Sequence, residues 1–226
     1  MPAARLPANE TKRLSALHHY RILDTEPEDA FDDFASLAAH ICGTPIALIS
    51  LIDRDRQWFK SRVGLEVQET HRDLAFCAHA ILDDATLVVQ DAQNDLRFFD
   101  NALVTGDPKI RFYAGALLMS ATGMPLGTIC AIDTKPRTLD EKGEKALETL
   151  ARRVMVEMEL RTARRRPPGK LGDEPSPETH AMCSLCCRFR ERDGSWVPPV
   201  DFLEKRFGIK STHRICKDCL ANRLGL

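Results

Sequence analysis

Hydrophobic residues recur at helical spacing near both ends of the first 165 residues. Apolar side chains repeat every three or four positions over 11–23 and 27–42, with Gly43 directly after, and they repeat again over 138–165. This spacing predicts two opening helices and one long closing helix, and Gly43 marks the end of the second helix.

Two pairs of polar residues precede these apolar runs at the spacing of a capping box. In a capping box the first side chain and the residue three positions later satisfy the free backbone donors at a helix start. Thr25 with Glu28 and Thr138 with Glu141 fit this pattern. We therefore expect them to begin the second and the last helix.

Shorter runs of branched apolar residues lie between the helices. They are bounded by polar, glycine or proline turns, which is typical of strands, and we place strands at 45–53, 57–63, 87–89, 112–119 and 126–132. Helices, then antiparallel strands with a helical insertion, then a helix predict an α+β fold. We expect one central antiparallel sheet with helices packed on one of its faces.

The end of the chain has a different chemistry. Five of the eight cysteines lie in the last 44 residues, and Cys183/Cys186 and Cys216/Cys219 form two Cys-x-x-Cys pairs separated by 29 residues. Four thiolates at this spacing can close a tetrahedral zinc site, so we predict zinc on these four residues. Three neighbours could replace a ligand, namely Cys187, His180 and His213. A redox dithiol is the rival interpretation, but such pairs open a helix after a strand, and this region has no such pattern.

A change of composition separates the two parts. Residues 167–178 are rich in proline, glycine and acidic residues and contain no large apolar run, so they have little to bury. We predict a first domain over 1–166, a flexible linker over 167–179 and a cysteine-rich module over 180–226.

Charge and cysteine content limit the binding partners and the cellular compartment that we expect. The 226 residues carry 32 basic and 33 acidic side chains, and this balance gives no overall field to attract nucleic acid or an anionic membrane. The start of the chain has no apolar core of signal-peptide length, and no segment is long and apolar enough to span a membrane. We therefore expect a reducing cytoplasm, in which Cys42, Cys77 and Cys130 are small buried hydrophobic residues.

Seven segments of the first domain together resemble bacterial GAF sensor domains, in unbroken order from about Leu14 to Arg161. They are 19–28, 49–53, 57–61, 76–81, 91–98, 111–115 and 127–133. The resemblance implies a central antiparallel sheet with helices on one side, a ligand pocket on the other, and a sensory role in signalling. GAF domains of this kind are usually joined to histidine kinases, cyclic-dinucleotide enzymes or other outputs, and none of those catalytic modules fits into this chain.

Within the implied pocket, aromatic side chains and a few polar groups would hold an unknown small molecule. We predict that it is lined by Trp58, Phe76, Cys77, His79, Arg111, Phe112 and Tyr113. Taken singly, each could instead be an ordinary core or surface residue. We expect Arg97 to pair locally with Asp91 or Asp95 and to be structural.

Particular residues bear on catalysis and on the cofactors known from GAF domains. Free methionine sulfoxide reductases are GAF proteins that need a reactive thiolate, but residues 100–115, where that family has it, contain no cysteine. A helical spacing of two residues directs His79 away from Cys77, so it is badly placed to activate that thiol. The cysteine-histidine pair of bilin-binding members and the pattern of cyclic-nucleotide-binding members are missing, while haem on His79 is conceivable. We expect no enzyme and keep a cysteine-dependent reductase as the alternative.

The cysteine-rich end is similar to a short module found at the ends of bacterial signalling proteins, with a treble-clef-like arrangement. In that arrangement Arg192, Asp193 and Gly194 would turn a hairpin, and a small core would form from Trp196, Phe202 and Phe207. Such modules serve as protein adaptors, so we expect a signalling protein as partner. DNA binding through the basic residues of this end is a third possibility, because they could contact phosphates.

A last apolar stripe bears on assembly. Leu147, Leu150, Val154 and Met158 recur at three and four residue steps along the closing helix. They could cover the sheet, but in resembling GAF proteins the first and last helices often pack across a two-fold axis, and Leu14 and Leu17 could join that seam. We therefore expect a homodimer. The whole pattern favours a cytoplasmic, non-enzymatic signalling protein in which the GAF domain senses a small molecule or redox state.

Overall fold

The computed structural model describes residues 3–83, 85–165, 188–191, 193–199 and 201–202. The chain divides into two compact units, Met1–Arg166 and Pro167–Leu226, and each is described by itself. The linker predicted over 167–179 lies outside the described residues. Within the part of the chain that the structure describes, no helix combines the length and apolarity needed to cross a membrane.

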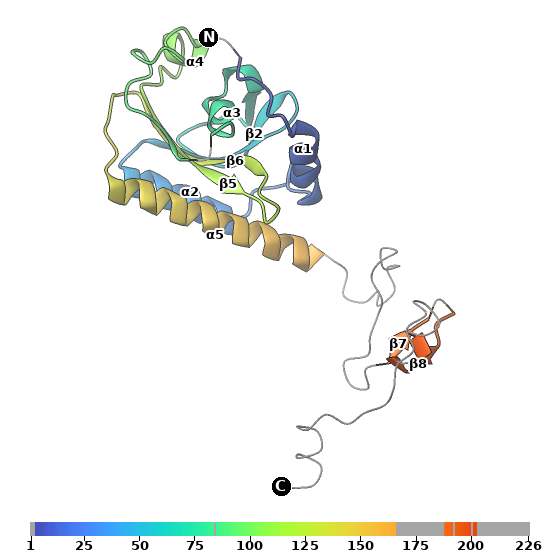
Figure 1. The fold of residues 1–226 in the computed structure, drawn as a ribbon. Coiled ribbons are helices and arrows are strands. Elements are labelled where there is room, and N and C mark those ends of the chain that lie inside the picture. Colours follow the sequence, from blue (N-terminus) through green and yellow to red (C-terminus); the bar gives the residue numbers. More distant parts are fainter. Residues whose placement is uncertain (1–2, 84, 166–187, 192, 200, 203–226) are drawn as a thin grey trace. The chain divides into compact units, whose positions relative to one another are not determined.

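The first unit is built on one antiparallel sheet of six strands (Figure 1). The strands lie in the order β3-β2-β1-β6-β5-β4. Their bounds are Ile46–Ile52 for β1, Arg56–Val63 for β2, Glu69–His71 for β3, Leu87–Val89 for β4, Phe112–Met119 for β5 and Pro125–Asp133 for β6. Five of them were predicted within one residue at each end, and β3 was not predicted. The α+β prediction with a single antiparallel sheet is confirmed.

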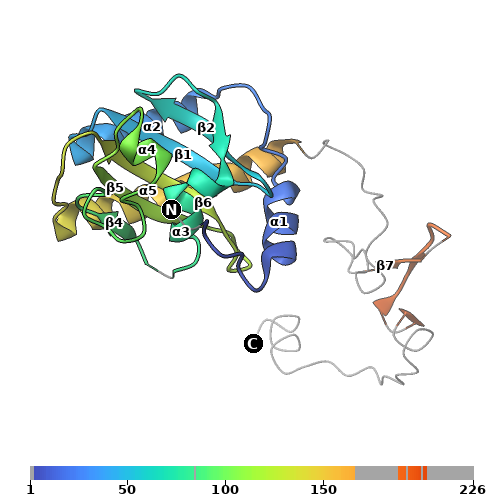
Figure 2. The same cartoon turned by 90° about the horizontal axis from the view of Figure 1, so that it is seen from above.

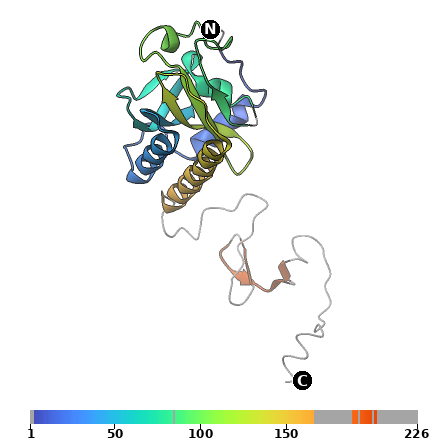
Figure 3. The ribbon, with the colours of Figure 1, turned by 90° about the vertical axis from the view of Figure 1, so that its left-hand side faces the viewer.

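Helices cover both faces of this sheet, but unequally. The two long helices, α2 (Asp29–Cys42) and α5 (Glu141–Arg165), lie side by side on one face (Figure 3). The shorter α1 (Glu10–His19) packs at the sheet's side against β6. The opposite face is covered by α3 (Phe76–Ala80) and by the loops that carry a 3-10 turn, Arg72–Leu74, and α4, Ala102–Thr105 (Figure 2).

The first helix is shorter than predicted. It ends at His19, and Arg21 and Asp24 then adopt positive φ angles of 45° and 56°. The left-handed region cannot continue a right-handed helix, so the chain turns here although the apolar spacing runs on to residue 23. Gly43, with φ of 61°, ends α2 as predicted.

Both predicted capping boxes are wrong. Thr25 Oγ1 donates to the carbonyl of Ile22 (2.6 Å), and the Glu28 carboxylate instead accepts bonds from distant cations. At α5 the cap is Asp140, whose Oδ1 accepts from the Gly143 amide (2.8 Å), rather than Thr138. In both cases the residue types were right for a helix start, but tertiary contacts decided which group they bind.

Alternation along the strands separates two hydrophobic clusters. On β1, Ala47, Ile49 and Leu51 face the long helices, whereas Ile46 and Leu48 face α3. Both faces are buried, and this explains why the strand sequence is apolar at nearly every position. The cluster toward the long helices is called the helix face below, and the cluster toward α3 is called the α3 face.

The predicted dimer seam belongs to the helix face of a single chain. Leu147, Val154 and Met158 are at most 1% exposed, and Leu17 of α1 is fully buried with them. These side chains cover the sheet, so they are not available to join a second copy.

Candidate functional site

A cavity of about 320 Å³ lies on the α3 face of the sheet. Most of its wall is apolar and comes from β1, β2, α3, the loop before β5, and β5. The lining includes Leu48, Phe59, Phe76, Cys77, Ile110 and Tyr113. Exposed residues such as Val67 and Asp107 also belong to the lining, so the cavity reaches solvent.

Two polar side chains of the wall have unused hydrogen-bonding atoms. Gln57 is 6% exposed, and neither its Oε1 nor the Oγ1 of Thr70 has a hydrogen-bond partner among the described residues. Both residues pair across strands β2 and β3, which holds them next to each other. A buried acceptor without a partner costs about 1–3 kcal/mol, so a ligand that donates a hydrogen bond would be favoured here.

One end of the wall is a cluster of sulfur and hydroxyl groups. Cys77 is the second residue of α3, and its Sγ accepts hydrogen bonds from Thr128 Oγ1 (3.1 Å) and Tyr113 Oη (3.3 Å). The Sγ of Cys130 lies 4.0 Å from the Sγ of Cys77. All four residues are at most 1% exposed. The cluster joins α3 to strands β5 and β6 at the centre of the sheet.

These contacts give the two thiols different acidities. Burial by itself raises the pKa of Cys77, but the contacts with Cys130, Thr128 and Tyr113, together with the nearby Ser50 hydroxyl, outweigh it and lower the pKa to about 6. The neighbouring Cys77 sulfur, together with burial, raises the pKa of Cys130 well above its ordinary value. Cys77 is therefore the thiol that loses its proton first, and Cys130 stays a donor.

The geometry is that of a sheet with two long helices on one face and a cavity of about 320 Å³ on the other. The sequence profile of the GAF domain matches residues 26–158, which is more than half of the chain. The chain belongs to the GAF domain family.

A curated relative of this GAF protein is a cyclic di-GMP phosphodiesterase from Pseudomonas aeruginosa. The two are 42% identical over 151 residues, which make up 66% of this chain and 26% of that protein. The chain thus spans about a quarter of the length of that relative.

Solved structures share the GAF fold at low sequence identity. The free methionine-R-sulfoxide reductase from Neisseria meningitidis, in complex with its substrate, has a TM-score of 0.50 and 17% identity, over 73% of this chain and 99% of that one. The GAF domain of the Acinetobacter phosphoenolpyruvate-protein phosphotransferase has a TM-score of 0.49 and 17% identity, over 67% and 96% of the two chains. At these identities the likeness concerns the fold alone.

Of the seven predicted ligand-binding residues, the cavity wall contains Phe76, Cys77 and Tyr113. Trp58 and Phe112 belong to the helix face, because they alternate with Gln57, Phe59 and Tyr113 along their strands. Neither residue therefore lines this cavity. Their aromatic character suggests a binding site, but it does not determine the face of the sheet on which each side chain lies.

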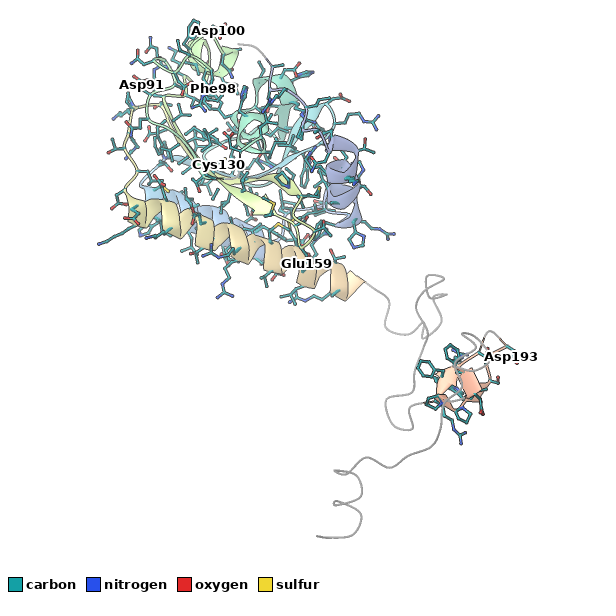
Figure 4. The ribbon with its side chains drawn as sticks, viewed as in Figure 1. Asp91, Phe98, Asp100, Cys130, Glu159 and Asp193 are labelled. Carbon is teal, nitrogen blue, oxygen red and sulfur yellow. The ribbon has the colours of Figure 1, made fainter. Side chains whose placement is uncertain are left out.

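His79 and Arg111 are not among the residues of the cavity wall, and both make other contacts. The His79 ring packs edge-on against Phe98 with centroids 5.0 Å apart, and burial lowers its pKa. Arg111 Nη1 donates to the carbonyls of Val104 (2.9 Å) and Ile110 (3.0 Å), which secures the loop after α4. Figure 4 shows Phe98 on the side of the sheet away from α5. The predicted local pairing of Arg97 is confirmed, because it forms two bonds with Asp95 (3.0 and 2.7 Å).

Sequence reasoning missed Gln57, Thr128 and Cys130. Thr128 and Cys130 alternate along β6 on the α3 face, and a period of two was visible in the sequence. The contact between Cys77 and Cys130 could not be predicted from local patterns, because the two residues are 53 positions apart in the sequence.

The second unit contains a short hairpin in its described residues. Strands β7 (Phe189–Arg190) and β8 (Trp196–Val197) pair, and Gly194, with φ of 86°, supplies the turn. The predicted hairpin is thus confirmed. Phe202 is buried and stacks on Phe189, whereas Trp196 is 41% exposed and is not part of a core in these residues.

The structure does not test the zinc prediction. Its four ligands, Cys183, Cys186, Cys216 and Cys219, lie outside the described residues, as do Cys187, His180, His213 and Phe207. Among the residues that are described, no group of three or more His, Cys, Asp or Glu could hold a metal ion.

Proposed function

We propose that the GAF domain is a receptor for a small, largely apolar molecule bearing one hydrogen-bond donor. The observation that supports this most is the cavity of about 320 Å³ with Gln57 in its wall and the Gln57 oxygen unused. Rotation about the broad terminal torsion of the amide presents Oε1 to a bound molecule. The ligand's apolar body then packs against Phe59 and Phe76.

We propose a sensory rather than an enzymatic role. Among the described residues, the cavity wall has one ionisable sulfur and no base in contact with it, because the partners of Cys77 are hydroxyl groups and a second thiol. Such a site can bind a molecule and report it through α5, whose residues pack on β5. A cysteine-dependent reductase stays the alternative. Its test is turnover of a sulfoxide substrate, which a pure receptor would leave unchanged.

A matched pair of probes tests the receptor. Indole and indene have nearly the same shape, but only indole has an N–H donor. We expect indole to bind at least about fivefold more tightly by calorimetry, which corresponds to one net hydrogen bond.

Variants of two glutamines complete this test. In Gln57→Leu the two affinities should become equal, while Gln68→Leu, an exposed residue of the same strand region, should keep the preference. Equal binding of both probes by the unchanged protein, or binding of neither, would remove the proposed ligand class.

For the second unit we propose that Cys183, Cys186, Cys216 and Cys219 bind one zinc ion and that the unit contacts a signalling protein. The spacing of the two cysteine pairs supports zinc binding. We favour a protein partner over DNA, because the chain has a net charge of −1 and so does not attract DNA overall. Metal analysis of protein purified under reducing conditions should find one zinc per chain. Its absence would overturn this part alone.

A homodimer stays a prediction without an assigned surface, because most residues of its predicted seam are buried within one chain and Leu14 is only partly exposed. Native mass spectrometry of the same material gives the oligomeric state and any bound small molecule together. A single-chain mass at micromolar concentration would argue against it.

A further inference from the structure

The two buried thiols of the α3 face lie in contact. Cys77 Sγ and Cys130 Sγ are 4.0 Å apart, both are free, and both residues are at most 1% exposed. A disulfide has sulfurs about 2.05 Å apart, so side-chain rotation and a small shift of α3 would join them. Such a contact between residues on a helix and a central strand is a feature that the receptor proposal does not use.

The surroundings distinguish one sulfur as the nucleophile. Thr128 and Tyr113 hydroxyls both donate to Cys77 Sγ, at 3.1 and 3.3 Å, and the two hydroxyl oxygens are themselves 3.3 Å apart. Donors of this kind stabilise a thiolate, the form of cysteine that reacts with oxidants. Cys130 Sγ lies 4.0 Å from Cys77 Sγ, and its neighbour and burial raise its pKa, so Cys130 holds its proton more firmly than Cys77 does.

The sheet makes room for this arrangement at one glycine. A Cβ on Gly115 would lie 2.1 Å from Tyr113 Oη and 2.7 Å from the ring carbon that bears it. Any other residue at this position would push the phenol away from Cys77. Gly115 also pairs with Cys130 across β5 and β6. The glycine therefore lies next to both the tyrosine and the second thiol.

The cavity brings solvent-accessible space next to Cys77, which is itself 1% exposed. Cys77 forms part of its wall, and the cavity reaches solvent past Val67 and Asp107. The wall between is mostly apolar, so neutral molecules enter more readily than charged ones. A neutral oxidant with a weak O–O bond fits this requirement, whereas charged reductants such as glutathione are disfavoured.

We propose that Cys77 is an oxidation site for hydroperoxides and that Cys130 closes the product to a buried disulfide. This inference rests on the receptor proposal only in that the oxidant uses the same cavity. The Cys77 thiolate attacks one peroxide oxygen and the O–O bond breaks, which gives a sulfenic acid and an alkoxide that takes up the proton lost by Cys77. The Cys130 sulfur then attacks the Cys77 sulfur, and the S–O bond breaks. Water leaves with the Cys130 proton, so two thiols and one hydroperoxide give one disulfide, one alcohol and one water.

Oxidation would be read out by the cavity itself. Closing the bond draws Cys77 away from Thr128 and Tyr113 and moves the first turn of α3, which forms part of the wall together with Phe76. Ligand binding and thiol state are thereby coupled through one helix, and each should change the other.

Peptide mapping of the full-length, fully reduced protein tests this. After trypsin, residues 73–97 and 112–137 each contain one cysteine, Cys77 and Cys130 respectively. Treatment with one to five equivalents of peroxide should link these two peptides with loss of two hydrogens, and dithiothreitol should separate them. If both cysteines stay fully alkylatable, or if Cys77 is oxidised without the link, the proposal is overturned.

Two oxidants identify the source. Hydrogen peroxide and cumene hydroperoxide share the reacting group, but only cumene hydroperoxide has an apolar body that suits the cavity. Faster linking by cumene hydroperoxide assigns the site to organic hydroperoxides, and faster linking by hydrogen peroxide assigns it to hydrogen peroxide. No linking by either is the overturning result.

Variants assign the roles. Cys130→Ser should leave a sulfenic acid on Cys77 that dimedone labels, and Cys77→Ser should leave Cys130 unoxidised. Tyr113→Phe should slow linking about tenfold at pH 5 but only about twofold at pH 7, as expected when a thiol pKa of about 6 rises by one unit. Cys42→Ser is the matched control, because burial raises the pKa of that α2 thiol to about 11. If Cys130→Ser does not fold, the wild-type map still decides.

The indole titration keeps this proposal separate from the receptor. Linking without an indole preference supports the thiol pair alone, and an indole preference without linking supports the receptor alone. Gln57→Leu should lose the indole preference and still form the link.

Discussion

The two faces of the sheet are both buried, yet they differ in chemistry. The helix face joins α1, α2 and α5 to the strands through apolar side chains such as Phe31, Leu147 and Val154, all fully buried. The α3 face contains buried thiols, hydroxyls and an amide around a cavity. Strand alternation lets one sheet do both, because neighbouring residues point to opposite sides. We therefore predict that substitutions on the helix face affect mainly stability and that those around the cavity affect mainly the proposed ligand binding.

Charged groups appear at the edge of the helix face, where they are paired. The register between β1 and β2 shifts at Ile49/Ser50 and skips Lys60, so Lys60 and Ser61 both reach toward α2. Lys60 Nζ bonds Glu28 (2.7 Å), and Ser61 Oγ bonds Asp32 (2.5 Å). Arg161 of α5 binds the same Glu28 oxygen at 2.7 Å. One carboxylate therefore connects α2, β2 and the end of α5.

The largest expected effect is a cavity made on the helix face. Phe31→Ala should lower the free energy of unfolding by about 3–5 kcal/mol, because Phe31 is fully buried between α2 and the sheet. Urea unfolding followed by circular dichroism measures this. Phe99→Ala, at a residue that is 51% exposed, should change it by less than about 0.5 kcal/mol. Equal losses in both variants would contradict the assignment of stability to this face.

A smaller loss should follow from removing the shared charge. Glu28→Gln should cost about 1.5–3 kcal/mol, since Lys60 and Arg161 are 3% and 4% exposed and both lose the bond to a charged carboxylate. The same unfolding measurement applies. Glu26→Gln, an exposed neighbour, is the control and should leave stability unchanged within error. If Glu28→Gln leaves the free energy of unfolding unchanged, the contacts of Glu28 with Lys60 and Arg161 are dispensable for stability.

A third prediction concerns acid. Burial raises the pKa of Glu10, but bonds from Arg13 and Arg72 outweigh it and lower the pKa from 4.5 to about 2. A lowered pKa means that this carboxylate stabilises the fold fully above about pH 4.5 and loses that contribution as the pH falls toward 2.

The test compares unfolding of Glu10→Gln and the unchanged protein across this range. Glu10→Gln should be less stable by about 1 kcal/mol at pH 7, and the difference should shrink below pH 4.5. Glu66→Gln, on an exposed loop, should follow the unchanged protein throughout. A constant difference at all pH values would contradict the assigned pairing.

The smallest effect is expected on the α3 face, with the opposite sign. Gln57→Leu should raise the free energy of unfolding by up to about 1 kcal/mol, because it removes a buried acceptor that has no partner among the described residues. Thermal unfolding measures this, with Gln68→Leu as control. A loss of more than 1 kcal/mol would show that the Gln57 amide is structural and would weaken the receptor proposal.

Much of this architecture was predictable because it depends on local patterns. Branched apolar runs located five strands, and helical spacing located α2 and α5. Sequence patterns failed where a distant partner decided the outcome. Glu28 binds Lys60 and Arg161 instead of capping a helix, and Leu147 and Val154 cover the sheet instead of joining a second chain.

The site divides in the same way. The sequence by itself determined the order of elements, the residue types on each strand and the two cysteine pairs near the end of the chain. Only the tertiary structure decided that Trp58 and Phe112 face the long helices while Gln57 and Tyr113 face the cavity, and that Cys77 meets Cys130. The reason is physical: periodicity is a property of neighbours along the chain, whereas a contact over 53 residues depends on how the whole sheet closes.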